Sequence, residues 1–144
     1  MAKAVVLYRI ASVLLILFAV GHTFGFLKFQ APTAEGRAVW ESMNHVHFQV
    51  GSTDATYARF YIGFGVFQTL YLLFTAFLAW HLGTMARSAP QAIGALSWAF
   101  FAVQLVSLVL SWIYFLPPPI VLSGLVAICI GWASWLVSTA STQN

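Results

Sequence analysis

The side chains that could perform acid–base or metal chemistry gather in one stretch of the chain, residues 28–59. It contains all three acidic residues and two of the four histidines, namely Glu35, Glu41, His45, His47 and Asp54. On a helix, Glu41 and His45 would share a face, whereas an extended chain would put His45 and His47 on one side. Imidazole with carboxylate suits zinc, iron or copper, and histidine also transfers protons near neutral pH.

A further histidine, His22, lies near the end of the first apolar segment, on the membrane side where residues 28–59 follow. We therefore expect a catalytic group at that membrane face, formed by His22, Glu41, His45 and His47. The three histidines are also the expected ligands of any metal ion. Their spacing matches no specific zinc motif such as H-E-x-x-H, so a structural or interfacial role for these residues stays open.

Four long apolar segments must position these residues. Hydrophobic residues make up 61% of the 144-residue chain and charged residues 6%, whereas soluble domains are about half apolar and about a quarter charged. Lipid is therefore the natural solvent for most of the chain, and backbone groups in lipid must be hydrogen-bonded within helices. A spanning helix needs ~20 apolar residues, and the predicted spans are residues 5–27, 57–82, 92–116 and 120–137.

A long first connection and a tight last one shape the predicted fold. Apolar residues recur at intervals of three and four between residues 34 and 48, which favours an amphipathic helix lying in the membrane interface. Three prolines at positions 117–119 separate the third and fourth spans and predict a tight antiparallel hairpin. The fold class is therefore all-α: an integral membrane four-helix bundle that forms a single domain over residues 1–144.

Cap and turn residues predict the ends of the second span. Ser52 or Thr53 is expected to cap it, with Asp54 in its first turn, where the helix dipole favours negative charge. At the other end, Gly83 and the residues up to Pro90 are expected to stop the helix.

Two of the spans carry polar side chains within the membrane. These are Tyr61 and Gln68 on the second span, and Gln104, Ser107, Ser111 and Tyr114 on the third. Polar side chains in lipid face the interior of a bundle and bond across helices. We expect these six residues to line a pocket for an amphipathic ligand such as a lipid, sterol or quinone. Hydrogen bonding between helices is the alternative role.

The charge distribution restricts partners and orientation. The six basic residues are scattered, so no basic run indicates nucleic-acid binding. Four spans put both termini on one side, and the basic residues divide evenly between the two sides. Short loops and a basic N-terminus favour termini in the cytoplasm. The sequence indicates no particular cofactor, and the single cysteine, Cys129, cannot form an intrachain disulfide.

The outline of four spans, a long first connection and a tight final hairpin resembles small uncharacterised bacterial four-helix membrane proteins, including the DoxX-like group. The leading hypothesis is a multi-pass membrane protein that binds a hydrophobic or amphipathic ligand within the bundle. One alternative is a metal- or haem-dependent oxidoreductase, or an isomerase, that uses the His/Glu group at one membrane face. The other is an accessory subunit of a larger membrane complex, or a homo-oligomer.

Overall fold

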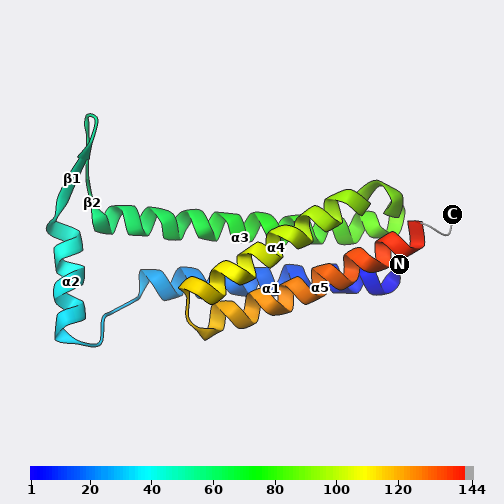
Figure 1. Cartoon of the computed structure of the whole chain (residues 1–144), viewed down its shortest axis with the longest axis horizontal. Coiled ribbons are helices and arrows are strands. Elements are labelled where there is room, and N and C mark those ends of the chain that lie inside the picture. The colour runs from blue at the N-terminus through cyan, green and yellow to red at the C-terminus, as the bar shows by residue number, and fades with distance from the viewer. Residues whose placement is uncertain (142–144) are drawn as a thin grey trace. The chain divides into compact units, whose positions relative to one another are not determined.

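The computed structural model describes residues 1–141, and most of them are helical (Figure 1). Within these residues, four helices are long and apolar enough to cross a membrane, as the sequence predicts. The helices are α1 (Ala2–Leu27), α2 (Ala34–His45), α3 (Tyr57–Ser88), the short 3-10 helix η1 (Pro90–Ile93), α4 (Gly94–Tyr114) and α5 (Pro117–Ser141). Two strands, β1 (His47–Val50) and β2 (Thr53–Thr56), complete the described chain.

Two of the predicted helix ends are wrong, one for a packing reason and one for a hydrogen-bonding reason. Gly83 does not stop α3, which continues to Ser88. A Cβ on Gly83 would lie 3.1 Å from the Cβ of Tyr8, so the glycine permits close approach of two helices instead of a turn. The three prolines from Pro117 form the first turn of α5, where a missing N–H breaks no helical hydrogen bond. The reversal itself occurs at Phe115 and Leu116.

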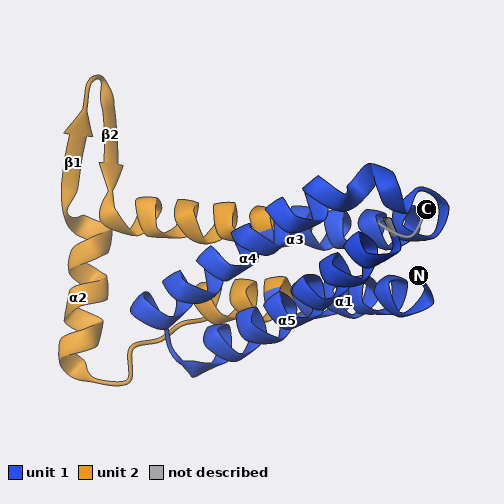
Figure 2. Cartoon of the chain, turned by 45° about the vertical axis from the view of Figure 1, so that its right-hand side comes forward, with its two compact units in different colours: residues 1–18, 72–144 blue, residues 19–71 orange. Residues whose placement is uncertain are grey.

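The chain forms two compact units, coloured separately in Figure 2. The first unit combines residues 1–18 with the chain from residue 72 onward, and the second consists of residues 19–71. Helices α1 and α3 each contribute residues to both units, whereas α4 and α5 belong to the first unit and α2 with the hairpin belongs to the second.

Buried polar residues and exposed apolar residues characterise the first unit. Among the described residues of this unit, seven polar side chains are buried, namely Ser12, Thr75, Ser97, Gln104, Ser111, Ser123 and Ser134. On the same helices, large apolar side chains such as Phe74, Val106 and Trp112 are exposed. A water-soluble domain has the opposite distribution. The arrangement suits helices whose outer surface faces lipid and whose polar groups bond to one another inside.

Helices α4 and α5 pack against each other as an antiparallel hairpin, as the sequence predicts. Near the open end of the hairpin, Trp98 Nε1 donates a hydrogen bond to Ser138 Oγ at 2.8 Å. Further along, the ring of Phe101 covers Gly131, where an added Cβ would lie 2.6 Å from the ring. The glycine therefore lets an aromatic side chain fill the space between the two helices.

In the first unit, α1 and α3 also approach closely through small residues. Tyr8 packs at Gly83, and Ser12 Oγ donates to the carbonyl of Ala76 at 2.8 Å. The same two helices have fully or almost fully buried alanines, namely Ala4, Ala11, Ala76, Ala79 and Ala86. Small side chains let helix backbones approach, which is the usual way that helices associate in lipid.

The second unit contains α2, which is shorter than the predicted helix of residues 34–48. Thr33 caps it, because its Oγ1 accepts a hydrogen bond from the N–H of Gly36 at 3.1 Å. The helix ends at His45, and the N–H of Val46 still bonds to the carbonyl of Ser42. An extended strand then begins at His47.

An antiparallel β-hairpin replaces the expected cap of the second span. Strands β1 and β2 pair so that His47 faces Thr56 and Val50 faces Thr53. Gly51, whose φ is 62°, forms the turn, a conformation that glycine adopts without strain. The cap of α3 is Thr56, because its Oγ1 accepts the N–H of Arg59 at 3.2 Å. The predicted cap at Ser52 or Thr53 is therefore wrong, and Asp54 lies in β2 instead of in the first turn of the helix.

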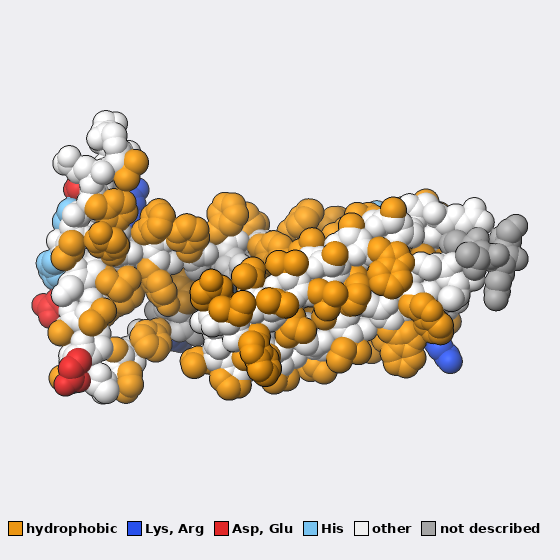
Figure 3. Space-filling view, viewed as in Figure 1, with side chains coloured by type: hydrophobic (Ala, Val, Ile, Leu, Met, Phe, Trp, Pro, Cys, Tyr) orange, Lys and Arg blue, Asp and Glu red, His pale blue; other side chains and the backbone are white. Residues whose placement is uncertain are grey.

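The hairpin and α2 contact the beginning of α3 through aromatic rings. The ring of Phe48 lies 4.9 Å from that of Tyr57, and the ring of Trp40 lies 5.8 Å from that of Tyr61. Figure 3 shows the acidic and histidine side chains along the margin of α2 and the hairpin that faces away from α3, with apolar side chains on the inner side. The second unit therefore has a polar outer face and an apolar inner face.

Candidate functional site

An apolar groove runs between α4 and α5, close to the turn that joins them. Its volume is about 510 Å³. The residues that line it are all apolar or glycine, namely Leu108, Val109, Trp112, Ile120, Val121, Gly124, Leu125 and Ile128. Gly124 has no side chain, which leaves room between the two helices in the groove. A Cβ added at Gly124 would lie 3.8 Å from Leu108 Cδ1, in ordinary contact. An elongated hydrocarbon group would match this lining chemically.

The buried face of α4 is mostly polar, and none of its residues lines this groove. Its buried residues are Ser97, Phe100, Gln104 and Ser111, at the three-, four- and seven-residue intervals of one helix face. Ser111 Oγ and Ser123 Oγ of α5 are hydrogen-bonded at 3.1 Å. Ser123 was not among the predicted site residues. The signal for it is positional, since it follows Ser111 by twelve residues across the tight hairpin.

Gln104 differs from the other buried polar residues because its amide nitrogen has no partner. Its side chain is 3% exposed, and Nε2 is buried without a hydrogen-bond acceptor in the described structure. In contrast, Ser134 Oγ donates to the carbonyl of Ser97 at 3.0 Å, and Tyr8 OH donates to Ser97 Oγ at 2.8 Å. A buried amide that lacks a hydrogen bond is energetically costly.

The other predicted ligand-binding residues are only partly buried or are exposed. Ser107 is partly buried, and its Oγ donates to the carbonyl of Val103 at 2.9 Å within α4. Tyr114 is 72% exposed at the end of α4. Tyr61 and Gln68 are exposed on the part of α3 that belongs to the second unit. Of the six predicted residues, only Gln104 and Ser111 are buried.

In the second unit, His22 joins α1 to α3 through its imidazole ring. Its Nε2 donates to the carbonyl of Gly65 at 3.1 Å, which places the ring proton on Nε2. The hydroxyls of Thr23 and Thr69 are hydrogen-bonded at 2.8 Å one residue further along α1. The ring of Phe26 covers Gly65, where an added Cβ would lie 2.8 Å from the ring. This group of contacts fixes the orientation and tautomer of His22.

His45 and Glu41 do not interact through their charged groups. His45 Nδ1 donates to the backbone carbonyl of Glu41 at 2.8 Å, inside α2. The side chains of both residues are exposed. The helix therefore brings these two residues onto one face, as expected. The hydrogen bond between them is accepted by the backbone carbonyl of Glu41 and not by its carboxylate.

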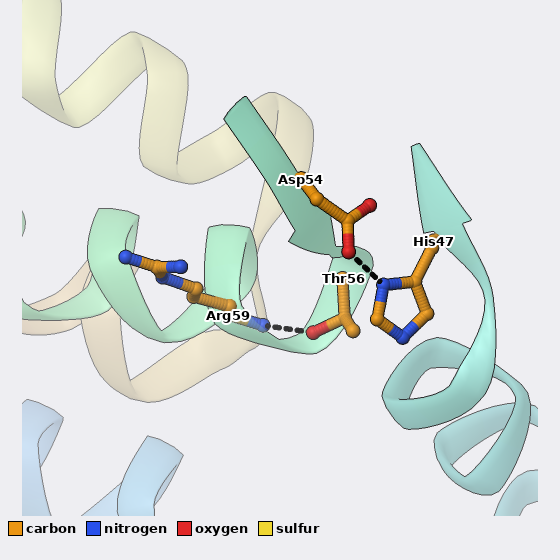
Figure 4. A network of polar contacts seen from close by, with 4 residues as sticks. All are labelled: His47, Asp54, Thr56 and Arg59. Carbon is orange, nitrogen blue, oxygen red and sulfur yellow. Dashed lines mark hydrogen bonds and ion pairs between the residues drawn. The ribbon is translucent and has the colours of Figure 1, made fainter. Parts of the chain in front are cut away.

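His47 pairs with a carboxylate that was not predicted as its partner. His47 Nδ1 donates to Asp54 Oδ2 at 2.7 Å across the hairpin (Figure 4). Both side chains are slightly more than half exposed, at 56% and 53%. The guanidinium of Arg59 points away from the pair, and only its backbone N–H contacts Thr56. The sequence signal for this pair is weak: polar and apolar residues alternate from His47 to Val50, and Gly51 follows as a turn residue.

The predicted three-histidine metal site does not form in the described chain. Within residues 1–141, no three His, Cys, Asp or Glu side chains lie close enough together to hold a metal ion. His22 sits in the α1–α3 contact, His45 on α2 and His47 on the hairpin, and each bonds to a different oxygen. The physical reason for the difference is the strand at His47, which turns this residue toward Asp54.

Arg9 occupies an unusual position in the first unit. Its guanidinium carbon lies 3.2 Å from the centroid of the Trp80 ring, and Nη2 donates to Thr84 Oγ1 at 3.0 Å. Nη1 is buried without a hydrogen-bond partner in the described structure. All three acidic residues belong to the second unit, so the aromatic face and the hydroxyl provide the local stabilisation of this cation.

Comparison with known proteins gives no relative, because no protein-family model, curated protein or solved structure matches this chain. The chemistry of the residues described above is therefore the basis for assigning a function.

Proposed function

We propose that the chain is a multi-pass membrane protein that binds a hydrophobic or amphipathic small molecule in the groove between α4 and α5. The observation that carries the proposal is the groove itself, about 510 Å³ in volume and lined by seven hydrophobic residues and one glycine. Ligand sites for small molecules typically have volumes of about 300–1,000 Å³ and predominantly apolar walls. Lipids, quinones and sterols have apolar parts that suit such a lining.

The distribution of polar residues supports the membrane part of the proposal. Buried serines on α4 and α5 bond to one another or to helix carbonyls, as Ser111 does with Ser123 and Ser134 with Ser97. Large apolar residues on the same helices face outward. In lipid, this arrangement leaves the groove directly accessible to molecules dissolved in the bilayer, so a ligand would not need to pass through water.

The second unit adds an interfacial element to the proposed arrangement. Helix α2 and the hairpin have acidic and histidine side chains on the outer face and apolar side chains on the inner face (Figure 3). We place them in the membrane interface, where a polar face meets water and an apolar face meets acyl chains. With four crossings, both termini lie on one side of the membrane, which we assign to the cytoplasm.

The test of the groove is the identity and amount of the molecule that co-purifies with the protein. Native mass spectrometry of the protein extracted from its membrane is expected to show one retained small molecule per chain. A Gly124→Leu variant is expected to lose it, because the new side chain fills the groove. Gly63→Leu is the matched control, since a Cβ at Gly63 meets no atom within 4 Å. Retention by Gly124→Leu, or only bulk lipid on the wild type, would contradict the proposal.

A second candidate function is acid–base or metal chemistry at the hairpin. The observation that favours it is the 2.7 Å contact between His47 Nδ1 and Asp54 Oδ2. A carboxylate that holds Nδ1–H leaves the lone pair of Nε2 available to accept a proton or bind a metal. Elemental analysis of the wild type and of His47→Ala tests whether the hairpin binds a metal ion. Absence of a stoichiometric metal from both proteins would exclude metal binding at the hairpin.

A further inference from the structure

We infer that Arg9 and Arg87 bind the phosphate of an anionic lipid headgroup, at the membrane face where α1 begins and α3 ends. Both residues belong to the first unit, and neither lines the groove between α4 and α5. The inference goes beyond the proposed ligand groove. It rests on the membrane part of the proposed function alone, because a headgroup reaches these residues only if α1 and α3 cross the bilayer.

The first support is that the guanidinium of Arg9 is held against α3. Its central carbon lies 3.2 Å from the centroid of the Trp80 ring, and Nη2 donates to Thr84 Oγ1 at 3.0 Å. The absence of a side chain at Gly83 leaves room for this approach, since a Cβ there would lie 3.6 Å from Arg9 Nε. The cation is therefore fixed in one place before a ligand arrives, which lowers the entropic cost of binding.

The second support is that part of this guanidinium is open to the surroundings. Arg9 is partly exposed, and both Trp80 and Thr84 are exposed. The protein encloses Nη1, whereas Nε is neither enclosed nor hydrogen-bonded within the described residues. A headgroup oxygen can therefore accept a hydrogen bond from Nε without displacing a contact that Arg9 makes in the chain.

The third support is that the first unit has no acidic side chain to neutralise Arg9. All three acidic residues of the chain lie in the second unit, whereas Lys3, Arg9 and Arg87 lie in the first. A guanidinium has several N–H donors and no acceptor, and Arg9 uses one donor for Thr84. An anion from outside the chain would supply both the missing negative charge and the missing acceptors.

Arg87 supplies a second cation on the same side of α3. Trp80, Thr84 and Arg87 follow one another at intervals of four and three residues, which places them on one face of the helix. Arg87 is exposed in the last turn of α3, and Arg9 contacts this face at Thr84, about one turn earlier. Two guanidinium groups from neighbouring turns suit a phosphate, because its oxygens accept charge-assisted hydrogen bonds from both.

The location of the two arginines indicates that a lipid supplies the phosphate. Helix α1 begins at Ala2, so Arg9 lies about 10 Å along the helix from its first residue. In a spanning helix this is near the boundary between acyl chains and headgroups, where tryptophans such as Trp80 are common. A lipid with net negative charge is favoured over a zwitterionic one, since a choline group would bring another cation close to Arg9.

The experiment is a lipid titration of the delipidated protein in a neutral detergent. Phosphatidylglycerol and phosphatidylcholine with identical acyl chains are added together at equal concentration, and native mass spectrometry measures the occupancy of each. The wild type is expected to favour phosphatidylglycerol by about tenfold, in line with the usual strength of hydrogen bonds to charged groups. Equal occupancy would overturn the inference. Displacement of bound phosphatidylglycerol by inorganic phosphate would overturn the assignment of the site to a lipid.

Variants separate a local site from the general positive charge of this membrane face. Arg9→Gln removes the cation and is expected to lower the preference to about twofold or less. Lys3→Gln is the matched control, since it changes the total charge equally at an exposed position of the same helix, and it is expected to keep the preference. A preference that survives unchanged in Arg9→Gln would overturn the inference.

Arg87→Gln covers the case in which Arg9→Gln does not fold, because Arg87 is exposed in the last turn of α3. It is expected to lower the preference about threefold, as suits an exposed charge. If Arg87→Gln is the one variant of the two that folds, an unchanged preference in it would overturn the inference.

Gly124→Leu distinguishes failure of this inference from failure of the proposed function. The variant is expected to lose the molecule in the groove and to keep the preference for phosphatidylglycerol, because Gly124 lies on α5 whereas the two arginines lie on α1 and α3. Loss of the groove molecule together with equal occupancy of the two lipids on the wild type would leave the groove and overturn the headgroup site. Retention of the groove molecule by Gly124→Leu would overturn the groove, and the lipid preference of the wild type would still support the headgroup site.

Discussion

Each of the three histidines in the second unit uses one ring nitrogen for a hydrogen bond within the chain. His22 bonds to the carbonyl of Gly65, His45 to the carbonyl of Glu41 and His47 to the carboxylate of Asp54. Only the last partner is charged. At the scale of single residues, the His47–Asp54 pair is therefore the one imidazole contact whose strength depends on a charged group.

We predict that this pair stabilises the hairpin locally. His47 lies opposite Thr56, and Asp54 lies opposite Gln49, so the pair bridges the strands diagonally on one face. Because both side chains are exposed, the expected contribution is about 0.2–1 kcal/mol. Asp54→Asn is therefore expected to raise the hydrogen-exchange rate of the β1 and β2 amides by about 1.4- to fivefold.

The control for the hairpin prediction is Gln49→Ala, which removes a neighbouring side chain on the same face without removing the ion pair. Hydrogen–deuterium exchange resolved by peptide is the measurement. Exchange in α4 and α5 is expected to stay unchanged in all variants. Unchanged exchange at residues 47–56 in Asp54→Asn would show that the pair does not stabilise the strands.

At the scale of elements, glycines decide how closely helices pack in each unit. The ring of Phe101 occupies the space at Gly131, and the ring of Phe26 occupies the space at Gly65. In both cases an aromatic side chain from one helix fills the notch left by a glycine on another. These contacts replace the driving force that water provides in soluble proteins, because in lipid association depends on close packing.

We predict that Gly131→Ala loosens the α4–α5 hairpin. The new Cβ would lie 2.6 Å from Phe101 Cε2, so the ring must move, at a typical overpacking cost of about 1–3 kcal/mol. Alanine regains about 1 kcal/mol through its helix propensity. Thermal unfolding in detergent is therefore expected to show a net loss of up to about 2 kcal/mol.

Two further variants test whether the clash causes that loss. Gly21→Ala is the control, since a Cβ there meets no atom within 4 Å, and it is expected to be neutral or stabilising. Adding Phe101→Leu to Gly131→Ala removes the ring and is expected to restore part of the stability. A double variant as unstable as the sum of the single variants would contradict a direct contact.

The sequence predicts secondary structure well where a long apolar segment dominates. It predicts secondary structure poorly where pairing with a neighbouring strand determines the conformation. The four membrane-length helices follow from composition and length alone. The hairpin from His47 to Thr56 was missed because its four-residue strands have only a weak pattern, and cross-strand pairing stabilises them. The helical spacing of apolar residues extends past the end of α2 to Val46, although the backbone of Val46 is already extended and leads into β1.

At the scale of the whole molecule, the candidate site was only partly predictable. Buried polar residues on α4 were identified from their spacing, and Gln104 and Ser111 are indeed buried. The apolar groove was not foreseen, because it depends on where Gly124 faces Leu108 across the hairpin. Spacing along one helix shows which residues share a face, whereas the register between two helices requires the structure.

The last prediction concerns the number of membrane crossings and their direction. In a Cys129→Ser background, single cysteines are introduced at four exposed positions outside or at the ends of the long helices, namely Ala2, Ser52, Ser88 and Leu116. Four crossings require Ala2 and Ser88 on one side, and Ser52 and Leu116 on the other. With the termini in the cytoplasm, a membrane-impermeant maleimide is expected to label only positions 52 and 116 in intact cells. The reverse pattern would keep the four spans and overturn the orientation, whereas labelling of positions 52 and 88 together would overturn the four crossings, because α3 alone separates them.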